Sequence, residues 1–278
     1  MHREREQYGT IVVVGGGCYG SYYVRQLQRA AAAGAVVCER LLVVDRDPDC
    51  RVAGEHQSAA HGAAPPVAPE PVVAVQDWHD FFHAYLAEAM SRGSAADVDA
   101  IVPSPLMPHL LFDWLIQRAR ERWPHRCVQR RALERPPSIP WQHAAPDGTH
   151  YVSFAEWICP INCIEPARCP EIRGPRTWSM PPALRAYASA ERARGHQMDG
   201  PVVFQCSHRA YGVGMIDTRD VLAADRLVAA AGAMDATEVL VGTVSHCHGA
   251  WGILAVGAPA GRADARDSRG APATASAR

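Results

Sequence analysis

Short apolar runs alternate with longer helix-forming segments through the first part of the chain. Four of these runs are continuously apolar, which is typical of strands that are buried on both faces of a parallel sheet. Asp77 is expected to cap the second of the helices, and Gly93 is expected to end it. The predicted strands are 11–14, 41–44, 72–75 and 100–102, and the predicted helices are 21–33, 78–92 and a segment that follows residue 105.

The pattern changes beyond about residue 124. Ten of the chain's 22 prolines lie between residues 136 and 182, and this density predicts a long insertion without regular structure. Regular elements are expected to resume afterwards. They are strands at 202–204 and 239–244 and a helix that begins at Asp217 or Thr218, while a surface loop is expected at 53–70 and a disordered tail from 258.

Strands that alternate with helices predict an α/β fold, in which helices cover both faces of a doubly wound parallel sheet. The predicted organisation is an α/β half at 1–124, a Pro/Cys-rich insertion at 125–200, completion of the sheet at 201–257 and a tail at 258–278. Ligands of such sheets bind at the carboxyl ends of the strands. The segments expected along that edge are 15–20, Asp45, Asp77, 103–105, 206–208 and 245–248.

A glycine-rich turn follows the first predicted strand and opens the first predicted helix. Its glycines, Gly15, Gly17 and Gly20, have the spacing G-x-G-x-x-G. The first glycine permits a tight turn, the second lets backbone amides approach a pyrophosphate, and the third allows the helix to pack closely on the strand. Asp45 ends the second strand, where an acidic side chain can accept hydrogen bonds from ribose hydroxyls.

With these residues the sequence resembles the Rossmann dinucleotide-binding proteins, and in particular the TrkA-N (RCK) type of domain. The resemblance covers about residues 10–110 and includes the stretch Asp45-Arg-Asp-Pro. It implies a Rossmann-like fold that binds NAD through Gly15, Gly17, Gly20 and Asp45. Arg46 could accept the 2′-phosphate of NADP, so both cofactors stay open, with Asp45 favouring NAD.

Three cysteines lie within eleven residues of the insertion, at Cys159, Cys163 and Cys169. Prolines beside them predict a loop that brings the sulfurs together, as an iron–sulfur cluster or zinc requires. The spacing C-x3-C-x5-C matches neither the ferredoxin nor the zinc-ribbon pattern. Cys206 is the preferred fourth ligand, with Cys247 as the other candidate. Catalytic thiols without metal and a purely structural role are the remaining interpretations.

Histidines gather at the ends of the last two predicted strands. His246 and His248 flank Cys247, and His208 follows Cys206 by two residues. Imidazoles titrate near neutral pH, so His208, His246 and His248 are candidates for catalytic acids and bases. Glu165 lies within the cysteine segment and is a weaker candidate, because a loop carboxylate is usually solvated.

The composition of the chain argues against several classes of binding partner. The net charge is −1, all 28 basic residues are arginine, and no polybasic run or long apolar stretch occurs. These features argue against nucleic-acid binding, membrane insertion and lysine Schiff-base chemistry. They favour a cytoplasmic location and a small-molecule substrate or redox partner, and they leave homo-oligomerisation open.

A nucleotide motif and clustered thiols in one chain suggest electron chemistry. The leading hypothesis is an NAD(P)-dependent oxidoreductase with a cysteine-ligated metal centre near the nicotinamide. The first alternative is a non-enzymatic NAD-binding redox or metal sensor. A thiol-based transferase that uses a bound nucleotide is the second.

Overall fold

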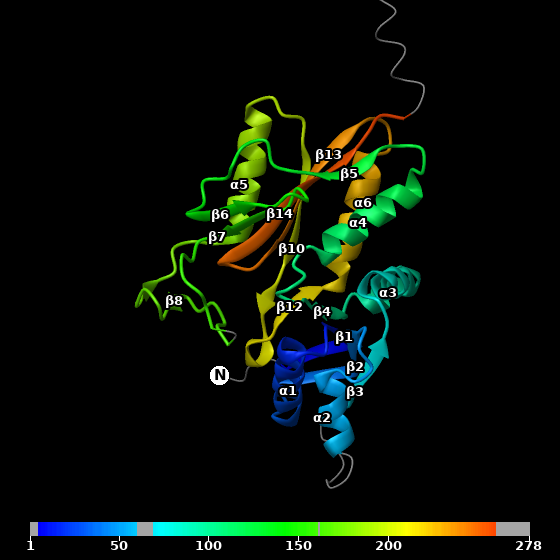
Figure 1. The fold of residues 1–278 in the computed structure, drawn as a ribbon, viewed down its shortest axis with the longest axis vertical. Helices are drawn as coiled ribbons and strands as arrows, with labels where there is room; N and C mark the ends of the chain where they lie inside the picture. The colour runs from blue at the N-terminus through cyan, green and yellow to red at the C-terminus, as the bar shows by residue number, and fades with distance from the viewer. Residues whose placement is uncertain (1–4, 60–68, 161, 260–278) are drawn as a thin grey trace, which may run out of the picture.

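The strands of this protein form two main sheets, one above the other in Figure 1. The computed structural model describes residues 5–59, 69–160 and 162–259. Both parallel and antiparallel strand pairs occur, so the fold is mixed α/β. Among the described residues, no helix is long and apolar enough to cross a membrane.

The first sheet, sheet A, contains the four strands predicted in the first half of the chain. Its order is β11-β12-β4-β1-β2-β3, and β1 to β4 are parallel. A late strand, β12, pairs antiparallel with β4 and extends the sheet on that side. The bounds are β1 Glu6–Val14, β2 Val36–Asp45, β3 Pro71–Val75, β4 Ala100–Val102, β11 Ser207–His208 and β12 Gly214–Asp217.

The second sheet, sheet B, is mostly antiparallel. Its order is β10-β13-β14-β7-β6, with β5 paired to the far end of β14, and only β10 and β13 are parallel neighbours. The bounds are β5 Val128–Arg131, β6 Trp141–Ala144, β7 His150–Ser153, β10 Asp199–Gln205, β13 Thr237–Val244 and β14 His248–Val256; β8 Arg168–Cys169 and β9 Gly174–Pro175 form a separate pair.

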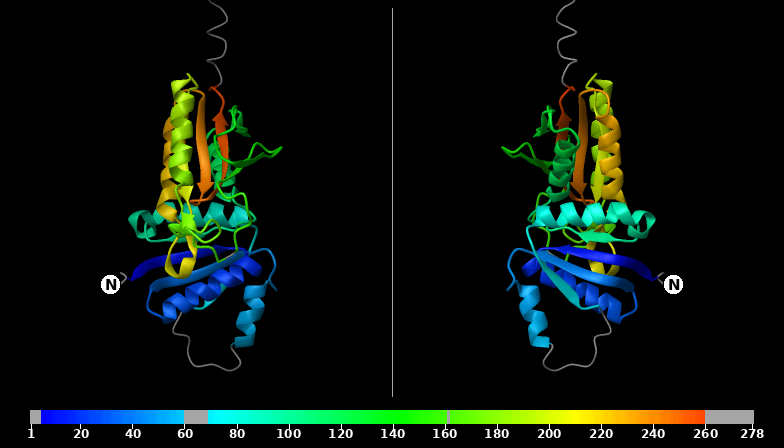
Figure 2. Two further views of the ribbon diagram at one scale, coloured as in Figure 1. Left: turned by 90° about the vertical axis from the view of Figure 1, so that its left-hand side faces the viewer. Right: turned by 90° about the vertical axis from the view of Figure 1, so that its right-hand side faces the viewer.

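The helices arrange the two sheets into layers, which the turned views of Figure 2 show from the side. Helices α1 and α2 pack on one face of sheet A, and α5 packs on one face of sheet B. Helices α3, α4 and α6 lie between the sheets and share one apolar core with both of them. The bounds are α1 Cys18–Ala32, α2 Arg51–Ala59, α3 Trp78–Arg92, α4 Leu110–Arg122, α5 Met180–Ala193 and α6 Thr218–Ala231.

Local sequence explains the best-predicted elements. In β1, Ile11 and Val13 face the core under α1, whereas Val12 and Val14 face the core between the sheets. Both faces of the strand are therefore buried, and its apolar run is continuous for that reason. The Asp77 carboxylate accepts a hydrogen bond from the His79 amide at 2.8 Å and caps α3, as predicted.

The structure corrects three expectations. The strands predicted at 202–204 and 239–244 exist, but they belong to sheet B and do not complete the first sheet. The segment 125–200 is not an irregular insertion, because it supplies strands and a helix to sheet B. A loop was expected at 53–70, but residues 53–59 belong to helix α2. Most of the remainder of that segment lies outside the described residues, and so does the tail from residue 260.

Candidate functional site

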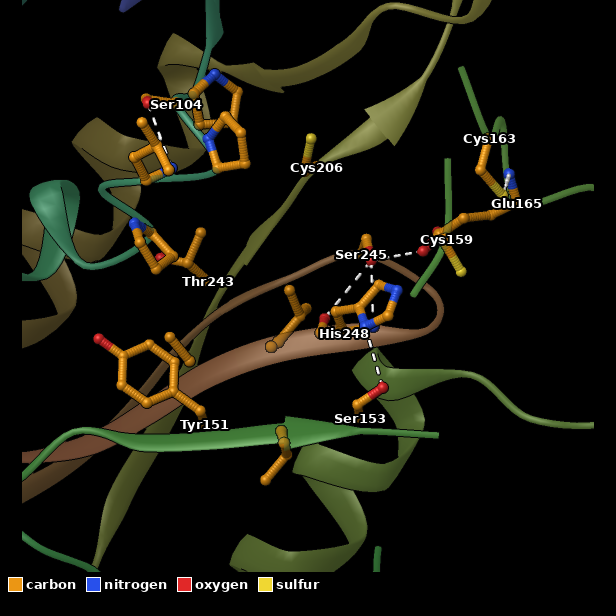
Figure 3. A pocket seen from close by; sticks show the side chains of 18 of the residues that line it. Ser104, Tyr151, Ser153, Cys159, Cys163, Glu165, Cys206, Thr243, Ser245 and His248 are labelled. Atoms are coloured by element: carbon orange, nitrogen blue, oxygen red, sulfur yellow. Dashed lines mark hydrogen bonds between the residues drawn. The ribbon is translucent and has the colours of Figure 1, made fainter. Parts of the chain in front are cut away.

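A cavity of about 690 Å³ lies at the junction of the two sheets and is called the junction cavity below. Its wall combines the first turns of α1, the loop after β4, strands β6 and β7, the cysteine segment and the facing ends of β10, β13 and β14 (Figure 3). The volume falls within the roughly 300–1,000 Å³ that is usual for small-molecule sites. Its lining includes Tyr19, Ser104, Tyr151, Thr243 and His248.

Five of the predicted metal ligands and catalytic histidines line this cavity, together with the weaker candidate Glu165. They come from three distant segments of the chain, and both thiols and imidazoles are among them. His246 and Cys169 are not part of the lining. The five are Cys159, Cys163, Cys206, His208 and His248.

Glu165 attaches the cysteine segment to the turn between β13 and β14. Its carboxylate accepts hydrogen bonds from the Ser245 hydroxyl at 2.6 Å and from the backbone amides of His246 at 2.7 Å and Cys247 at 3.0 Å. The side chain is buried, although the sequence had suggested a solvated carboxylate. Its backbone has a φ of +47°, which is uncommon outside glycine and is held here by these contacts.

The charge of Glu165 is stabilised by the same contacts. Burial alone would raise its pKa, but the hydrogen bonds from Ser245, His246 and Cys247 hold the pKa below the usual value. Because all of these donors come from one turn, the carboxylate is a structural anchor for the cysteine segment. With a lowered pKa it is ionised at neutral pH and has no proton to transfer. Sequence reasoning missed this role because the partners lie about 80 residues away.

His248 is fixed in a defined tautomer. The Ser153 hydroxyl donates to the Ala155 carbonyl at 2.6 Å and accepts from the Ala155 amide at 2.9 Å. Because that hydroxyl has one hydrogen, the Nδ1 of His248, 2.9 Å from the same oxygen, must be the donor. Burial lowers the pKa of His248, so the ring is neutral and its Nε2, on the side away from Ser153 in Figure 3, carries a free lone pair.

His208 and Cys206 form a second polar part of the wall. The Nδ1 of His208 is buried, has no hydrogen-bond partner among the described residues, and lies 3.9 Å from the Glu165 carboxylate. Burial lowers the pKa of His208 and raises that of Cys206 to about 12. Cys206 is therefore a protonated thiol, and Gly214 leaves room for its sulfur, since a Cβ there would lie 2.6 Å from it.

The other members of the predicted histidine group point elsewhere. His246 Nδ1 lies 2.9 Å from the hydroxyl of Ser179, beside the start of α5. The buried sulfur of Cys247 accepts a hydrogen bond from the indole of Trp178 at 3.2 Å. His246 thus lies outside the lining that contains His208 and His248, and its Nδ1 has a hydrogen-bond contact with Ser179 instead.

The four predicted metal ligands do not form a preassembled set. Cys159 is close enough to Cys163 for their thiols to hydrogen-bond, and its pKa is raised to about 11 by burial and by Cys163. Cys169 is buried in β8, outside the cavity lining, and Cys206 lies across the cavity at the end of β10. No group of three ligand atoms within 4.8 Å of one another includes a cysteine of the described chain.

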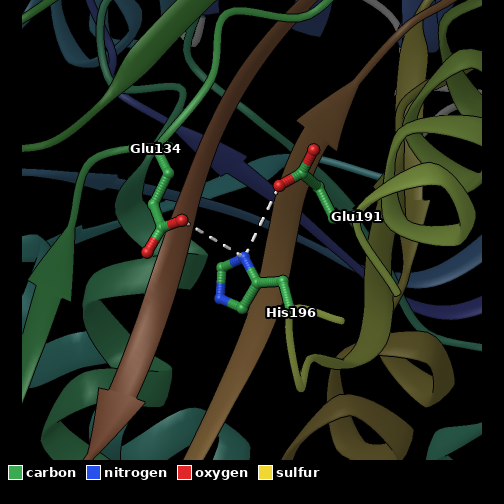
Figure 4. A group of neighbouring side chains, drawn as sticks. All are labelled: Glu134, Glu191 and His196. Carbon is green, nitrogen blue, oxygen red and sulfur yellow. Dashed lines mark ion pairs between the residues drawn. The ribbon is translucent and has the colours of Figure 1, made fainter. Parts of the chain in front are cut away.

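One other group has the spacing of metal ligands. Glu134, Glu191 and His196 bring their ligand atoms within 4.8 Å of one another (Figure 4). The buried Glu191 carboxylate, however, already pairs with Arg135 at 2.7 Å and Arg194 at 2.8 Å. Two guanidinium groups pair with it, so the Glu191 carboxylate is already engaged in an ion-pair network.

The glycine-rich turn adjoins the junction cavity through α1. The Gly16 amide donates to the Asp45 carboxylate at 2.6 Å, which joins the turn to the end of β2. A Cβ on Gly20 would stand 1.7 Å from the Gly15 carbonyl oxygen, so only glycine allows this contact between helix and turn. Positions 15 and 17 face open space, and α1 has neither a side-chain cap nor an acidic residue in its first turn.

Fold and site define a mixed α/β protein with a thiol- and imidazole-lined cavity at a sheet junction. Comparison with known families adds a match to the AF_1314_C family, described as "Uncharacterized protein, C-terminal domain", over residues 111–257. This region is more than half of the 278 residues, and the chain belongs to that family. No curated protein and no solved structure matches the chain. The matched region contains all of sheet B and the thiols and imidazoles of the cavity, whereas the glycine-rich turn precedes it.

Proposed function

We propose that this protein is an NAD(P)-dependent oxidoreductase whose substrate binds in the junction cavity. The observation that carries the proposal is the continuity between two features. The cavity begins at Tyr19 and Tyr23 of α1, the helix that the glycine-rich turn opens, and it extends to His208 and His248. A dinucleotide held at the turn would have this cavity beside it.

The residues of the turn fit a dinucleotide. Open space at Gly15 and Gly17 leaves room for phosphate, and the uncapped amides at the start of α1 favour an anion. The parallel order β3-β2-β1-β4 also matches the first four strands of the Rossmann order 3-2-1-4-5-6, which supports the same assignment. A bound nicotinamide would supply the hydride acceptor or donor, chemistry that no side chain provides.

NAD fits better than NADP. Arg46 is the cation next to Asp45, and its guanidinium pairs with the Asp77 carboxylate and lies 5.1 Å from the centre of the Trp78 ring. A guanidinium that is already paired and stacked is poorly available to a 2′-phosphate. Asp45 remains the acidic group at the end of β2, where the ribose of NAD would lie.

His248 is the residue best prepared to handle a proton. Its Nδ1 is held by Ser153, so Nε2 is left as a neutral acceptor at the cavity wall. A substrate hydroxyl that reached Nε2 could pass its proton there, and the serine contact would keep the ring oriented. In the reverse direction the protonated ring would return the proton to a carbonyl oxygen.

The first test measures NADH binding by fluorescence titration. It compares the wild-type chain with the variant Gly17→Asp. Gly17 has a φ of −76° and its Cβ position is open, so aspartate there should fold normally and cap α1, which should stabilise the chain by only about 0.3 kcal/mol. Its carboxylate should repel the pyrophosphate and weaken binding at least tenfold. Gly17→Asn is the control of equal size without charge, and it should lose less affinity.

Unchanged NADH affinity in Gly17→Asp, or no binding to the wild type, would overturn the proposal. Binding without consumption of NADH in the presence of carbonyl acceptors would instead favour the sensor hypothesis. His248→Gln separates these cases further, because it should reduce turnover by 10²-fold or more while NADH affinity stays the same.

A further inference from the structure

We infer that the junction cavity selects an uncharged substrate, an alcohol or carbonyl compound with an apolar or aromatic body. The inference deepens the proposed oxidoreductase function and rests on it for the reaction. The choice of ligand charge follows from the cavity wall alone.

No cationic side chain lines the junction cavity among the described residues, although the chain has 28 arginines. Recognition of a carboxylate or phosphate in a closed site usually requires a guanidinium or ammonium group. The wall therefore lacks the group that an anionic substrate needs. This absence is informative because arginine is abundant in the rest of the chain.

Two arginines that interact electrostatically with Cys206 and Cys247 are already engaged. Arg209 pairs with Asp217 at 2.7 Å and donates to the hydroxyl of Tyr8 at 3.3 Å. Arg176 donates to the carbonyl oxygens of Pro166 at 3.3 Å and Trp178 at 3.0 Å. Neither guanidinium lines the cavity, so neither offers a ready anion partner to a ligand.

A cationic substrate lacks a partner as well. Glu165 is the one carboxylate in the described lining, and its two oxygens already accept hydrogen bonds from Ser245, His246 and Cys247. Breaking these contacts to bind an amine would release the anchor of the cysteine segment. The wall thus offers no unpaired charge of either sign.

The remaining groups suit a neutral, partly apolar ligand. Aromatic rings from Tyr19, Tyr23, Trp141 and Tyr151 supply apolar contact area. The polar contribution comes from neutral groups, which include the free Nε2 of His248. Tyr151 and Thr243 of the lining also carry hydroxyl groups. A hydroxyl or carbonyl oxygen could satisfy these groups without adding charge.

Three probes of similar size test the inference: benzyl alcohol, benzoate and benzylamine. Binding of each to the full chain is measured by ligand-observed NMR titration at pH 7.5. Benzyl alcohol should bind at least ten times more tightly than either charged probe. Benzoate or benzylamine that bound as tightly as benzyl alcohol, or no binding of any probe, would overturn the inference.

A variant locates the binding and should shift the preference toward the anionic probe. Leu106 lines the cavity and is 72% exposed, so Leu106→Arg should fold normally and place a guanidinium at the rim. Benzoate affinity should rise at least fivefold in Leu106→Arg and stay at the wild-type level in the uncharged control Leu106→Gln. An equal change in both variants, or none in either, would contradict binding in this cavity.

The two proposals can fail separately. If the wild type prefers benzyl alcohol but does not bind NADH, the oxidoreductase function is wrong and the neutral cavity stands. If NADH binds with the expected loss in Gly17→Asp but benzoate is the preferred probe, the substrate class is wrong and the oxidoreductase function stands.

Discussion

Glu165 shows how a single side chain can position a site without taking part in its chemistry. The residue belongs to the cysteine segment, and its three donors belong to the turn that precedes His248. Cys159 and Cys163 thereby reach the same cavity as His248, although the chain between them and the histidine is long. The Glu165 carboxylate is charged, buried and hydrogen-bonded to three donors. Its replacement should therefore lower the stability of the chain and displace the cysteine segment at the cavity.

Glu165→Gln should lower the free energy of unfolding by about 1–3 kcal/mol at pH 7, because the amide NH₂ would face an N–H or O–H donor. The carboxyl has a lowered pKa in the folded chain, so its contribution is complete above its ordinary value of 4.5 and is lost as the pH falls below that. Urea unfolding at pH 7 and pH 4 should therefore show a smaller difference between variant and wild type in acid. Exposed Glu171→Gln, in the same segment, is the control and should change little at either pH.

Residues at predicted strand ends were the part of the site that the sequence could reveal. Cys206, His208 and His248 follow apolar runs and were expected along one edge of the sheet. They line one cavity, whereas Asp45 and Asp77, which were expected along the same edge, are not in its lining. Tyr151 and Thr243 carried no such signal, because their positions depend on strand pairings in sheet B. The contact between the cysteine segment and the turn before His248 could not be predicted either. A sequence does not distinguish a buried carboxylate such as Glu165 from a solvated one.

At the scale of elements, the turn between β1 and α1 is held by close contacts on two sides. The helix starts so close to the turn that the Cα of Gly20 has no room for a methyl group beside the Gly15 carbonyl. Hydrogen bonding of Gly16 to Asp45 then ties this turn to the neighbouring strand. The turn therefore has contacts with both the helix and the neighbouring strand, and such support suits a binding site that is formed before its ligand arrives.

Gly20→Ala should destabilise the chain by about 1–3 kcal/mol, because the helix must move away from the turn to admit the methyl group. Gly54→Ala is a matched glycine change in the neighbouring helix α2, where a Cβ meets no atom within 4 Å. This control should instead gain about 0.4–1 kcal/mol. Thermal unfolding of both variants checks the contrast, and equal effects would show that the close contact does not matter.

Strong periodicity decided which elements were predictable. Helix α3 has a buried face of Phe81, Phe82, Tyr85 and Leu86 together with a capping aspartate, and it was predicted nearly to its ends. Strands β5 and β6 are four residues long and carry mostly polar or partly exposed side chains, so they left no apolar run to detect. Their pairing along β14 and β7 is a property of the assembled sheet and not of the segments themselves.

The whole molecule is held together by a core that crosses the boundary of the family match. Val12 and Val14 of sheet A share one apolar cluster with Val239 and Val241 of sheet B, through helices α3, α4 and α6. Strand β12, from the matched region, returns to pair with β4 of sheet A. The Thr218 amide also donates to the carbonyl of Asp99 at 3.0 Å, next to that strand. These contacts make the two sheets parts of one structural unit.

The two sheets should therefore unfold in one cooperative transition. Native-state hydrogen exchange at low denaturant should give the same opening free energy, within about 1 kcal/mol, for the amides of β1 and of β13. Near-ultraviolet and far-ultraviolet circular dichroism should show coincident melting curves. Sheet A amides that opened several kcal/mol earlier than sheet B amides would mean that the shared core does not couple them.

The late return of β12 also has a consequence for synthesis on the ribosome. Strand β4 ends at residue 102 and its partner β12 begins at residue 214, which is 112 residues later. At about 5–20 residues per second, the nascent chain carries an unpaired β4 edge for roughly 6–22 seconds. Unpaired edges invite association with other chains, and the three-residue length of β4 keeps the exposed row of amides and carbonyls short while its partner is still being translated.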